Sequence, residues 1–245
     1  MSAAPRRLKQ ALSRLAGQAG RPKGAVVTRR DAAATLIAAG LAPAVLAQGG
    51  PVEGKHYARL GQALPGTPGK IEVIEFFFYR CPHCNAFDPL LEAWVHQLPA
   101  DVSFRRVPVG QQAILKLHQR MYYALEAMGA LTPAVHSGIF NAFHRGGVEA
   151  NDEDGVVALV SRLGVDAAKF KQTFNSFGIQ AKVQQGVKLA ELAGASEVPA
   201  LVIAGRWRTS PGQAGTPGQS EAAQGQQALA VADFLVKMAR SGKVS

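Results

Sequence analysis

Hydrophobic residues in the middle of the chain follow first a strand pattern and then a helix pattern. Ile71–Phe78 is β-branched and aromatic and almost unbroken, which is typical of a strand buried on both faces. After residue 81, apolar residues recur at spacings of three and four, the period of an amphipathic helix: Phe87, Leu90, Leu91, Trp94, Val95 and Leu98. Val102–Val109 then predicts a second strand. We therefore expect this segment to fold as strand, helix, strand.

The next part of the chain is expected to be entirely helical. Aspartates suited to helix N-caps and glycines suited to helix ends divide it into segments of helical length. The predicted helices are Gln112–Met128, Thr132–His144, Asp152–Leu163, Asp166–Phe177 and Ile179–Leu192. A run of helices thus separates the first strands from whatever follows.

The C-terminal part returns to strands and ends in a helix. Short apolar stretches predict strands at Ala200–Ala204 and Arg206–Thr209, and Tyr57–Leu60 predicts a short edge strand. Ser210–Gln219 is rich in Gly and Pro and predicts a loop, and Ala222–Ala239 predicts a closing amphipathic helix. Strands separated by helices favour an α/β sheet.

Residues 1–47 are predicted to be an export signal peptide. Arg29 and Arg30 precede the Ala- and Leu-rich stretch Ala32–Ala47, and small or neutral residues before the end of that stretch predict cleavage after Ala47. The paired arginines leave open whether the chain is exported folded or unfolded. An amphipathic N-terminal helix is the alternative interpretation. No apolar run free of Gly and Pro reaches the ~18 residues that a membrane span needs.

The positive charge is concentrated in the same N-terminal segment. The formal net charge is +10, from 27 Lys and Arg against 17 Asp and Glu. Residues 1–47 hold eight of the basic residues and one of the acidic residues, so the rest of the chain has 19 basic and 16 acidic residues and a net charge of +3. A nearly neutral body argues against nucleic-acid binding.

The chain has only two cysteines, Cys81 and Cys84, spaced C-x-x-C. A structural disulfide across so short a loop would restrict the unfolded chain little. A zinc site needs about four ligands, and covalent haem attachment needs a histidine where the chain has Asn85. The favoured interpretation is a redox-active dithiol that needs no metal and no organic cofactor, with the structural disulfide as its alternative.

The local sequence predicts different roles for the two thiols. Pro82 suits the first position of a helix, which puts Cys81 at the helix N-terminus, where the unpaired amides and the dipole stabilise an anion. Cys81 is therefore expected to be an exposed nucleophile of low pKa, and Cys84 to be buried and to resolve mixed disulfides. A protonated His83 would add positive charge beside Cys81, and Arg80 is a further candidate for that field.

The strand, the C-P-H-C motif and the late Val-Pro together resemble the bacterial DsbA family of thiol:disulfide interchange proteins, within the thioredoxin superfamily. The resemblance runs from Val52 to Lys243 and includes Glu53–Tyr57, Ile74–Phe77 and Val198–Ala200. It implies an α/β thioredoxin fold with an inserted all-helical domain. The expected domains are a thioredoxin-like first part at 48–111, the helical insert at 112–186 and a thioredoxin-like second part at 187–245.

The resemblance also implies further site residues. It implies a cis Pro199 that faces Cys81, with the Val198 backbone pairing with an extended substrate, and a buried Glu75 that relays protons beneath the cysteines. From the residues alone, Pro199 would be a strand-opening proline. Glu75 alternates onto the same face as Val73 and Phe77, which favours a buried acid, with a salt-bridged or partly hydrated side chain as the alternative. The substrate cleft is expected between the Cys81 helix end, the Val198–Pro199 loop and the facing side of the helical insert.

The function that the resemblance implies is that of a periplasmic thiol:disulfide oxidoreductase. It would donate a Cys81–Cys84 disulfide to unfolded or newly exported proteins and be reoxidised by a quinone-linked membrane oxidase of the DsbB type. We expect a monomer that binds neither metal nor nucleic acid. The alternatives are an exported thioredoxin-fold reductase or isomerase, and a redox-inert chaperone-like binding module with a structural disulfide.

Overall fold

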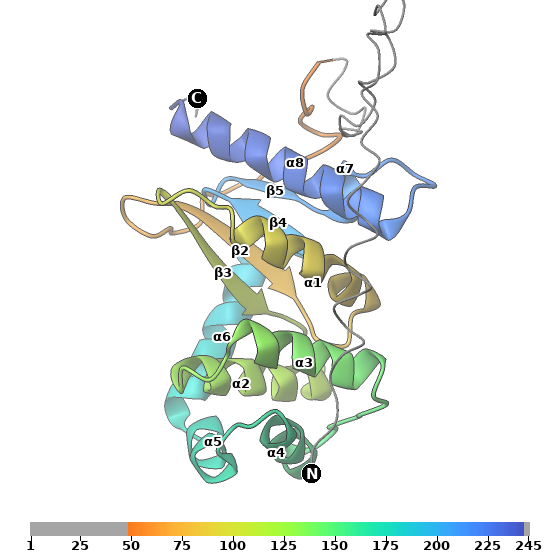
Figure 1. Ribbon diagram of the computed structural model, residues 1–245. Coiled ribbons are helices and arrows are strands. Elements are labelled where there is room, and N and C mark those ends of the chain that lie inside the picture. Colours follow the sequence, from red (N-terminus) through yellow and green to blue (C-terminus); the bar gives the residue numbers. More distant parts are fainter. Residues whose placement is uncertain (1–48, 243–245) are drawn as a thin grey trace, which may run out of the picture. The chain divides into compact units, whose positions relative to one another are not determined.

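A computed structural model describes residues 49–242. The predicted signal peptide, residues 1–47, lies outside the described residues. The described chain forms a five-stranded sheet of order β1-β5-β4-β2-β3 (Figure 1). Its strands are β1 (Ala58–Arg59), β2 (Ile71–Phe77), β3 (Val102–Pro108), β4 (Ala200–Ile203) and β5 (Trp207–Thr209).

Strand β2 is the centre of this sheet. It pairs in parallel with β3 and antiparallel with β4, while β5 pairs antiparallel with both β4 and β1. Every residue of β2 after Ile71 is buried, as its unbroken apolar sequence predicts for a strand covered on both faces. The one carboxylate near its C-terminal end, Glu75, lies opposite Arg106 of β3 and Leu201 of β4.

Helices cover the two faces of the sheet differently. α1 (Pro82–Val95) and α8 (Glu221–Arg240) pack together over one face, where Leu91 and Leu235 join Trp207 of β5 in a hydrophobic cluster. A second cluster lies on the opposite face of β2, where Ile74 and Phe76 meet the C-terminal part of the long helix α6. Val73 belongs to the first of these clusters and Ile74 to the second, because the pleat of a strand directs successive side chains to opposite faces.

The helical insert follows β3 and ends in that long helix. It contains α2 (Ala113–Ala127), α3 (Pro133–His144), α4 (Glu153–Arg162), α5 (Ala167–Phe174) and α6 (Phe177–Leu192). Figure 1 shows α2 to α5 gathered beyond the end at which β2 and β3 finish. The core of the insert is continuous with the residues that follow β2, because Phe77, Tyr79 and both cysteines belong to its hydrophobic cluster.

Every predicted strand and helix is present, and two segments differ from the prediction. The predicted loop Ser210–Gln219 contains a short helix, α7 (Pro211–Ala214), capped by the Ser210 hydroxyl, which accepts a hydrogen bond from the Gln213 N–H at 3.0 Å. The sequence predicted a break between two helices at Gly178. Helix α6 begins at Phe177, so Gly178 lies inside its first turn and does not end a helix there. α6 also continues unbroken through residue 186, the predicted end of the insert.

None of the helices within residues 49–242 is both long and apolar enough to cross a membrane.

Candidate active site

Cys81 lies at the N-terminal end of helix α1, as the sequence predicted. It is the N-cap residue, with an extended backbone, and Pro82 is the first residue of the helix. Its Sγ accepts a hydrogen bond from the backbone N–H of Cys84 at 3.3 Å. The unpaired N–H groups and the positive end of the helix dipole are therefore directed at the Cys81 sulfur.

Cys81 is buried, so the prediction of an exposed sulfur was wrong. The residue is 4% exposed, and Cys84 is fully buried. Both are free thiols in the hydrophobic cluster of the insert, which includes Tyr79 and Phe140. The loop at Val198 approaches from the other side, where the Cys81 thiol, when protonated, donates to the Val198 carbonyl oxygen at 3.6 Å. The spacing of residues in the sequence could not indicate that the cluster of the insert and the Val198 loop both bury Cys81.

The two thiols differ strongly in acidity. A hydrogen bond from the Cys84 thiol is the main cause that lowers the pKa of Cys81 to about 6; the backbone N–H groups of Cys84 and His83 and the charge of His83 add to it, and burial opposes it. Burial, followed by the contact with Cys81 and the charge of Glu75, raises the pKa of Cys84 well above its usual range. At neutral pH the reduced pair is therefore one thiolate, at Cys81, and one thiol.

His83 is exposed and has a partner that the sequence did not reveal. Its side chain is 68% exposed, and its Nδ1 is hydrogen-bonded to a carboxylate oxygen of Glu221, the first residue of α8. The two residues are 138 positions apart in sequence, so no local pattern links them. This pair joins the N-terminal ends of α1 and α8 beside Cys81.

Cys81 borders a cavity of about 620 Å³, which we call the Cys81 cavity. The Val198–Pro199 loop forms one wall, and its peptide bond is cis, as the resemblance implied. The helical insert contributes no residue to this cavity: among the described residues, the lining comes from Phe78, α1, this loop, Ser210–Gly212 and the start of α8. The short helix α7, absent from the sequence prediction, therefore lies at the edge of this cavity.

Glu75 is both buried and salt-bridged. It is 1% exposed, and its Oε2 lies 2.8 Å from Nε of Arg106 on the neighbouring strand. Burial is the main cause that raises the pKa of Glu75 to about 7; the charges of Asp88 and Glu92 add to it, and the Arg106 guanidinium opposes it. Glu75 is close enough to the cysteines for its charge to raise the pKa of Cys84. A carboxyl group that holds its proton near neutral pH thus lies in the core beneath the dithiol.

The same guanidinium binds two carboxylates of α1, which sequence reasoning missed. Nη2 of Arg106 lies 3.3 Å from Asp88 Oδ1 and 2.7 Å from Glu92 Oε1. Asp88 Oδ1 also lies 3.2 Å from Nε2 of His136, whose Nδ1 is hydrogen-bonded to the Tyr79 hydroxyl at 2.8 Å. Burial lowers the pKa of His136, so this imidazole adds no positive charge at neutral pH. One guanidinium therefore faces three carboxyl groups.

Arg80 contacts the helical insert. Its Nη1 donates to Asn151 Oδ1 at 2.9 Å, and its guanidinium lies 6.0 Å from the centre of the Phe143 ring. Both partners are in the insert, so Arg80 ties the residues before Cys81 to that domain.

Comparison with known proteins agrees with this geometry. The model of the DSBA-like thioredoxin domain matches residues 101–229. A thiol:disulfide interchange protein DsbA of Azotobacter vinelandii is 37% identical over 191 residues, which are 78% of this chain and 85% of that protein. The DsbA of Bordetella parapertussis is 41% identical over 190 residues, 77% of this chain and 88% of its own length. This chain belongs to the DsbA family. As a DsbA-family protein, it is a thiol:disulfide oxidoreductase.

Solved DsbA structures have the same fold. The crystal structure of Pseudomonas aeruginosa DsbA, 35% identical, aligns with a TM-score of 0.73 over 80% of this chain and 97% of its own. The DsbA of Xylella fastidiosa, 29% identical, aligns with a TM-score of 0.68 over 78% of this chain and 98% of its own. The expected α/β thioredoxin fold with an inserted helical domain is confirmed.

Within residues 49–242 of this DsbA-family protein, no three His, Cys, Asp or Glu side chains are grouped to hold a metal ion.

Proposed function

We propose that this protein is a periplasmic oxidase that donates a Cys81–Cys84 disulfide to newly exported proteins. The observation that carries the proposal is the low pKa of Cys81 at the N-terminus of α1. A stabilised thiolate favours the reduced form of the protein, and a disulfide whose reduced form is favoured is a strong oxidant. A periplasmic location is supported by the predicted signal peptide and by the oxidising environment that disulfide donation needs.

The reaction is two successive thiol–disulfide exchanges. A substrate thiolate attacks the Cys81 sulfur of the oxidised protein; the bond to Cys84 breaks, and Cys84 leaves as a thiolate. Because the pKa of Cys84 is raised, this thiolate takes up a proton, for which the neighbouring protonated Glu75 is the proposed donor. A second substrate thiolate then attacks the substrate sulfur of the mixed disulfide and releases Cys81 as a thiolate. Two electrons pass from the substrate dithiol to the protein.

Substrate recognition is proposed to use the loop at the cis peptide bond. Val198 and Pro199 border the same cavity as Cys81, so a chain lying along this loop would bring its cysteine to the reactive sulfur. What unfolded substrates have in common is mainly their backbone. Recognition is therefore expected to use hydrogen bonds between the substrate backbone and the backbone of Val198, and not the charges of substrate side chains. The ion pair of His83 and Glu221 lies at the same cavity, where His83 would stabilise the Cys81 thiolate.

The reduced protein would be reoxidised by a quinone-linked membrane oxidase of the DsbB type, as the family resemblance implies, and would act as a monomer without metal, organic cofactor or nucleic acid. A periplasmic reductase or isomerase would use the same dithiol in the opposite direction. A redox-inert chaperone would require a Cys81–Cys84 bridge that stabilises the fold.

The equilibrium with glutathione distinguishes these functions. The mature protein is equilibrated in buffers of varied reduced and oxidised glutathione at neutral pH, quenched with acid, and its thiols are counted. We expect the Cys81–Cys84 disulfide to be reduced at glutathione ratios that leave ordinary structural disulfides intact. His83→Ser should move the midpoint towards a less oxidising value. A protein that remains oxidised in strongly reducing buffer would refute the oxidase and favour the structural disulfide.

A further inference from the structure

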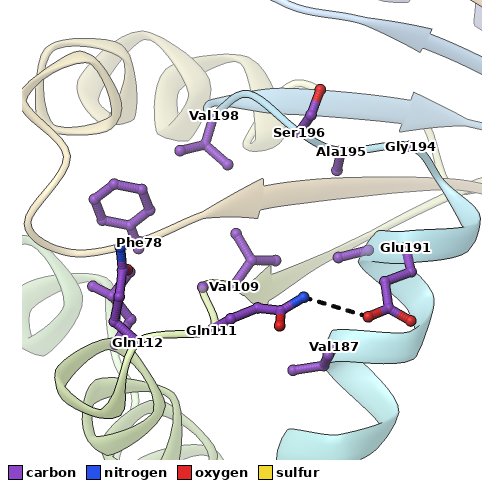
Figure 2. A pocket seen from close by; sticks show the side chains of 13 residues that line it. Phe78, Val109, Gln111, Gln112, Val187, Glu191, Gly194, Ala195, Ser196 and Val198 are labelled. Carbon is purple, nitrogen blue, oxygen red and sulfur yellow. Dashed lines mark hydrogen bonds between the residues drawn. The ribbon is translucent and has the colours of Figure 1, made fainter.

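A second cavity, of about 600 Å³, lies on the other side of the Val198 loop from most of the Cys81 cavity. We call it the α6 cavity. Its lining comes from Phe78, the segment that joins β3 to α2, Leu115 of α2, helix α6 and the residues before Pro199. Figure 2 shows Phe78 and Val198 at one end of this cavity, Val109 near its centre, and Val187 and Glu191 of α6 at the other end.

The two cavities meet at a shared edge. Phe78, Ser196 and Val198 border both of them. Phe78 and Val198 are only partly buried although both pack against the hydrophobic clusters on either side. The residues of β2 after Ile71 are buried, whereas Phe78, three residues before Cys81, is partly exposed and offers an apolar surface that the fold leaves uncovered. The reactive sulfur and the α6 cavity therefore lie on one continuous surface.

The chemistry of the lining favours an apolar guest. Val109, Leu115, Val187 and Ala190 line it with Phe78 and Val198. Glu191 is the only titratable lining residue among the described ones, and its Oε1 accepts a hydrogen bond from the Gln111 amide at 3.4 Å. A cavity of this size and character is typical of sites that bind apolar groups. It is large enough for a branched or aromatic side chain.

We propose that the α6 cavity binds an apolar side chain of the same substrate segment whose cysteine reacts with Cys81. This inference rests on the proposed function, because it requires an extended substrate lying along Val198. In an extended chain, side chains two positions apart point to the same face, ~6.8 Å apart. A substrate whose cysteine points to Cys81 therefore turns the side chain two or four positions away towards the enzyme as well, on the α6 side of Val198. Substrates with an apolar residue there are bound better than substrates with a polar one.

The test compares matched peptides and matched variants. Two reduced peptides carry two cysteines each and differ only in Leu or Ser at the positions two and four residues from the reacting cysteine. Ala190→Phe fills the α6 cavity, and Val187→Phe fills it from the neighbouring turn. Lys188→Phe adds the same ring to an exposed position of α6 outside the lining. Single-turnover oxidation of each peptide by the oxidised protein is followed by acid quench and chromatography.

The wild-type protein and Lys188→Phe should oxidise the Leu peptide at least about tenfold faster than the Ser peptide, since burial of a leucine side chain favours binding by that factor or more. Ala190→Phe and Val187→Phe should lose this preference and keep the wild-type rate with the small dithiol dithiothreitol, which also shows that they are folded. Equal rates for the two peptides in the wild type, or an unchanged preference in both filled variants, would overturn the inference. Failure of the wild-type protein to oxidise dithiothreitol would instead reject the proposed function.

Discussion

The Cys84 thiol is the main cause of the low pKa of Cys81, and two substitutions at Cys84 isolate that contribution. Cys84→Ala removes the donor, whereas Cys84→Ser keeps an O–H donor at the same place. A hydrogen bond to a charged group stabilises by ~1.5–3 kcal/mol, and one pKa unit corresponds to ~1.4 kcal/mol. Cys84→Ala should therefore raise the pKa of Cys81 by about one to two units from its value of about 6.

The pKa of Cys81 should change little in Cys84→Ser and only in part in Cys84→Ala. Cys84→Ser should titrate close to the wild type, because the hydroxyl replaces the thiol as donor. Even in Cys84→Ala, the backbone N–H groups of residues 83 and 84 and the charge of His83 still stabilise the thiolate. The pKa of Cys81 in that variant should therefore remain below that of an unperturbed thiol.

The assay is the ultraviolet absorbance of the thiolate, followed against pH on the reduced variants. Each Cys84 variant has a single thiol, so its curve reports Cys81 alone. Cys81→Ser is the control: its only thiol is Cys84, whose pKa burial raises, and it should show no transition near neutral pH. If the alanine and serine variants titrate at the same midpoint, the thiol–thiolate hydrogen bond is not the main cause, and the helix N-terminus and His83 carry the effect.

Three further outcomes follow from the same geometry. The pKa of Cys81 is depressed from 9.0 to about 6 in the folded state, so its contribution to the stability of the reduced protein is complete above pH ~9 and is lost as pH falls through ~6. Urea midpoints of the reduced and the oxidised protein, compared across that range, should show the reduced form gaining stability as pH rises. Parallel curves for the two forms would contradict this prediction. Arg106→Met leaves its carboxylates without a counter-charge and should lower the free energy of unfolding by ~3–5 kcal/mol at neutral pH. Lys182→Met is the control: it removes an ion pair with Glu126 in which the two side chains are 42% and 40% exposed, and it should cost ~1 kcal/mol or less in the same urea titration. Glu75 holds its proton up to a pH of about 7, so the oxidation of dithiothreitol measured by stopped flow should show a break near that pH that Glu75→Gln lacks; a break retained in the variant would exclude Glu75 as the proton donor.

The parts of this protein that the sequence predicts well are those set by local patterns. Strand β2 and helix α1 follow from an unbroken apolar run and from residues spaced by three and four. The place of Cys81 at the helix end follows from Pro82, since proline is favoured in the first turn. Glycine breaks are less reliable: Gly178 lies in the first turn of α6, where the backbone N–H groups have no partner within the helix in any case.

The parts that it does not predict depend on contacts between distant segments. Cys81 is buried because it contacts Val198, 117 positions later in the sequence, and belongs to the hydrophobic cluster of the insert. The three carboxyl groups around Arg106 come from β2 and α1, and their meeting is set by the register of β2 with β3 and by the packing of α1. Asp88 on the otherwise apolar side of α1 was the available signal, because a buried carboxylate requires a partner.

The order of the strands links the covering of the dithiol to the completion of the sheet. β2 and β3 are close in sequence, but β4 reaches β2 only after the whole insert has been made, since Glu75 lies opposite Leu201. This pairing therefore closes a long loop, at a cost in chain entropy that grows with the length of the loop. The cis loop that covers Cys81 directly precedes β4. Until β4 has joined the sheet, the Val198 loop cannot lie over Cys81, so the same strand that completes the sheet also completes the active site.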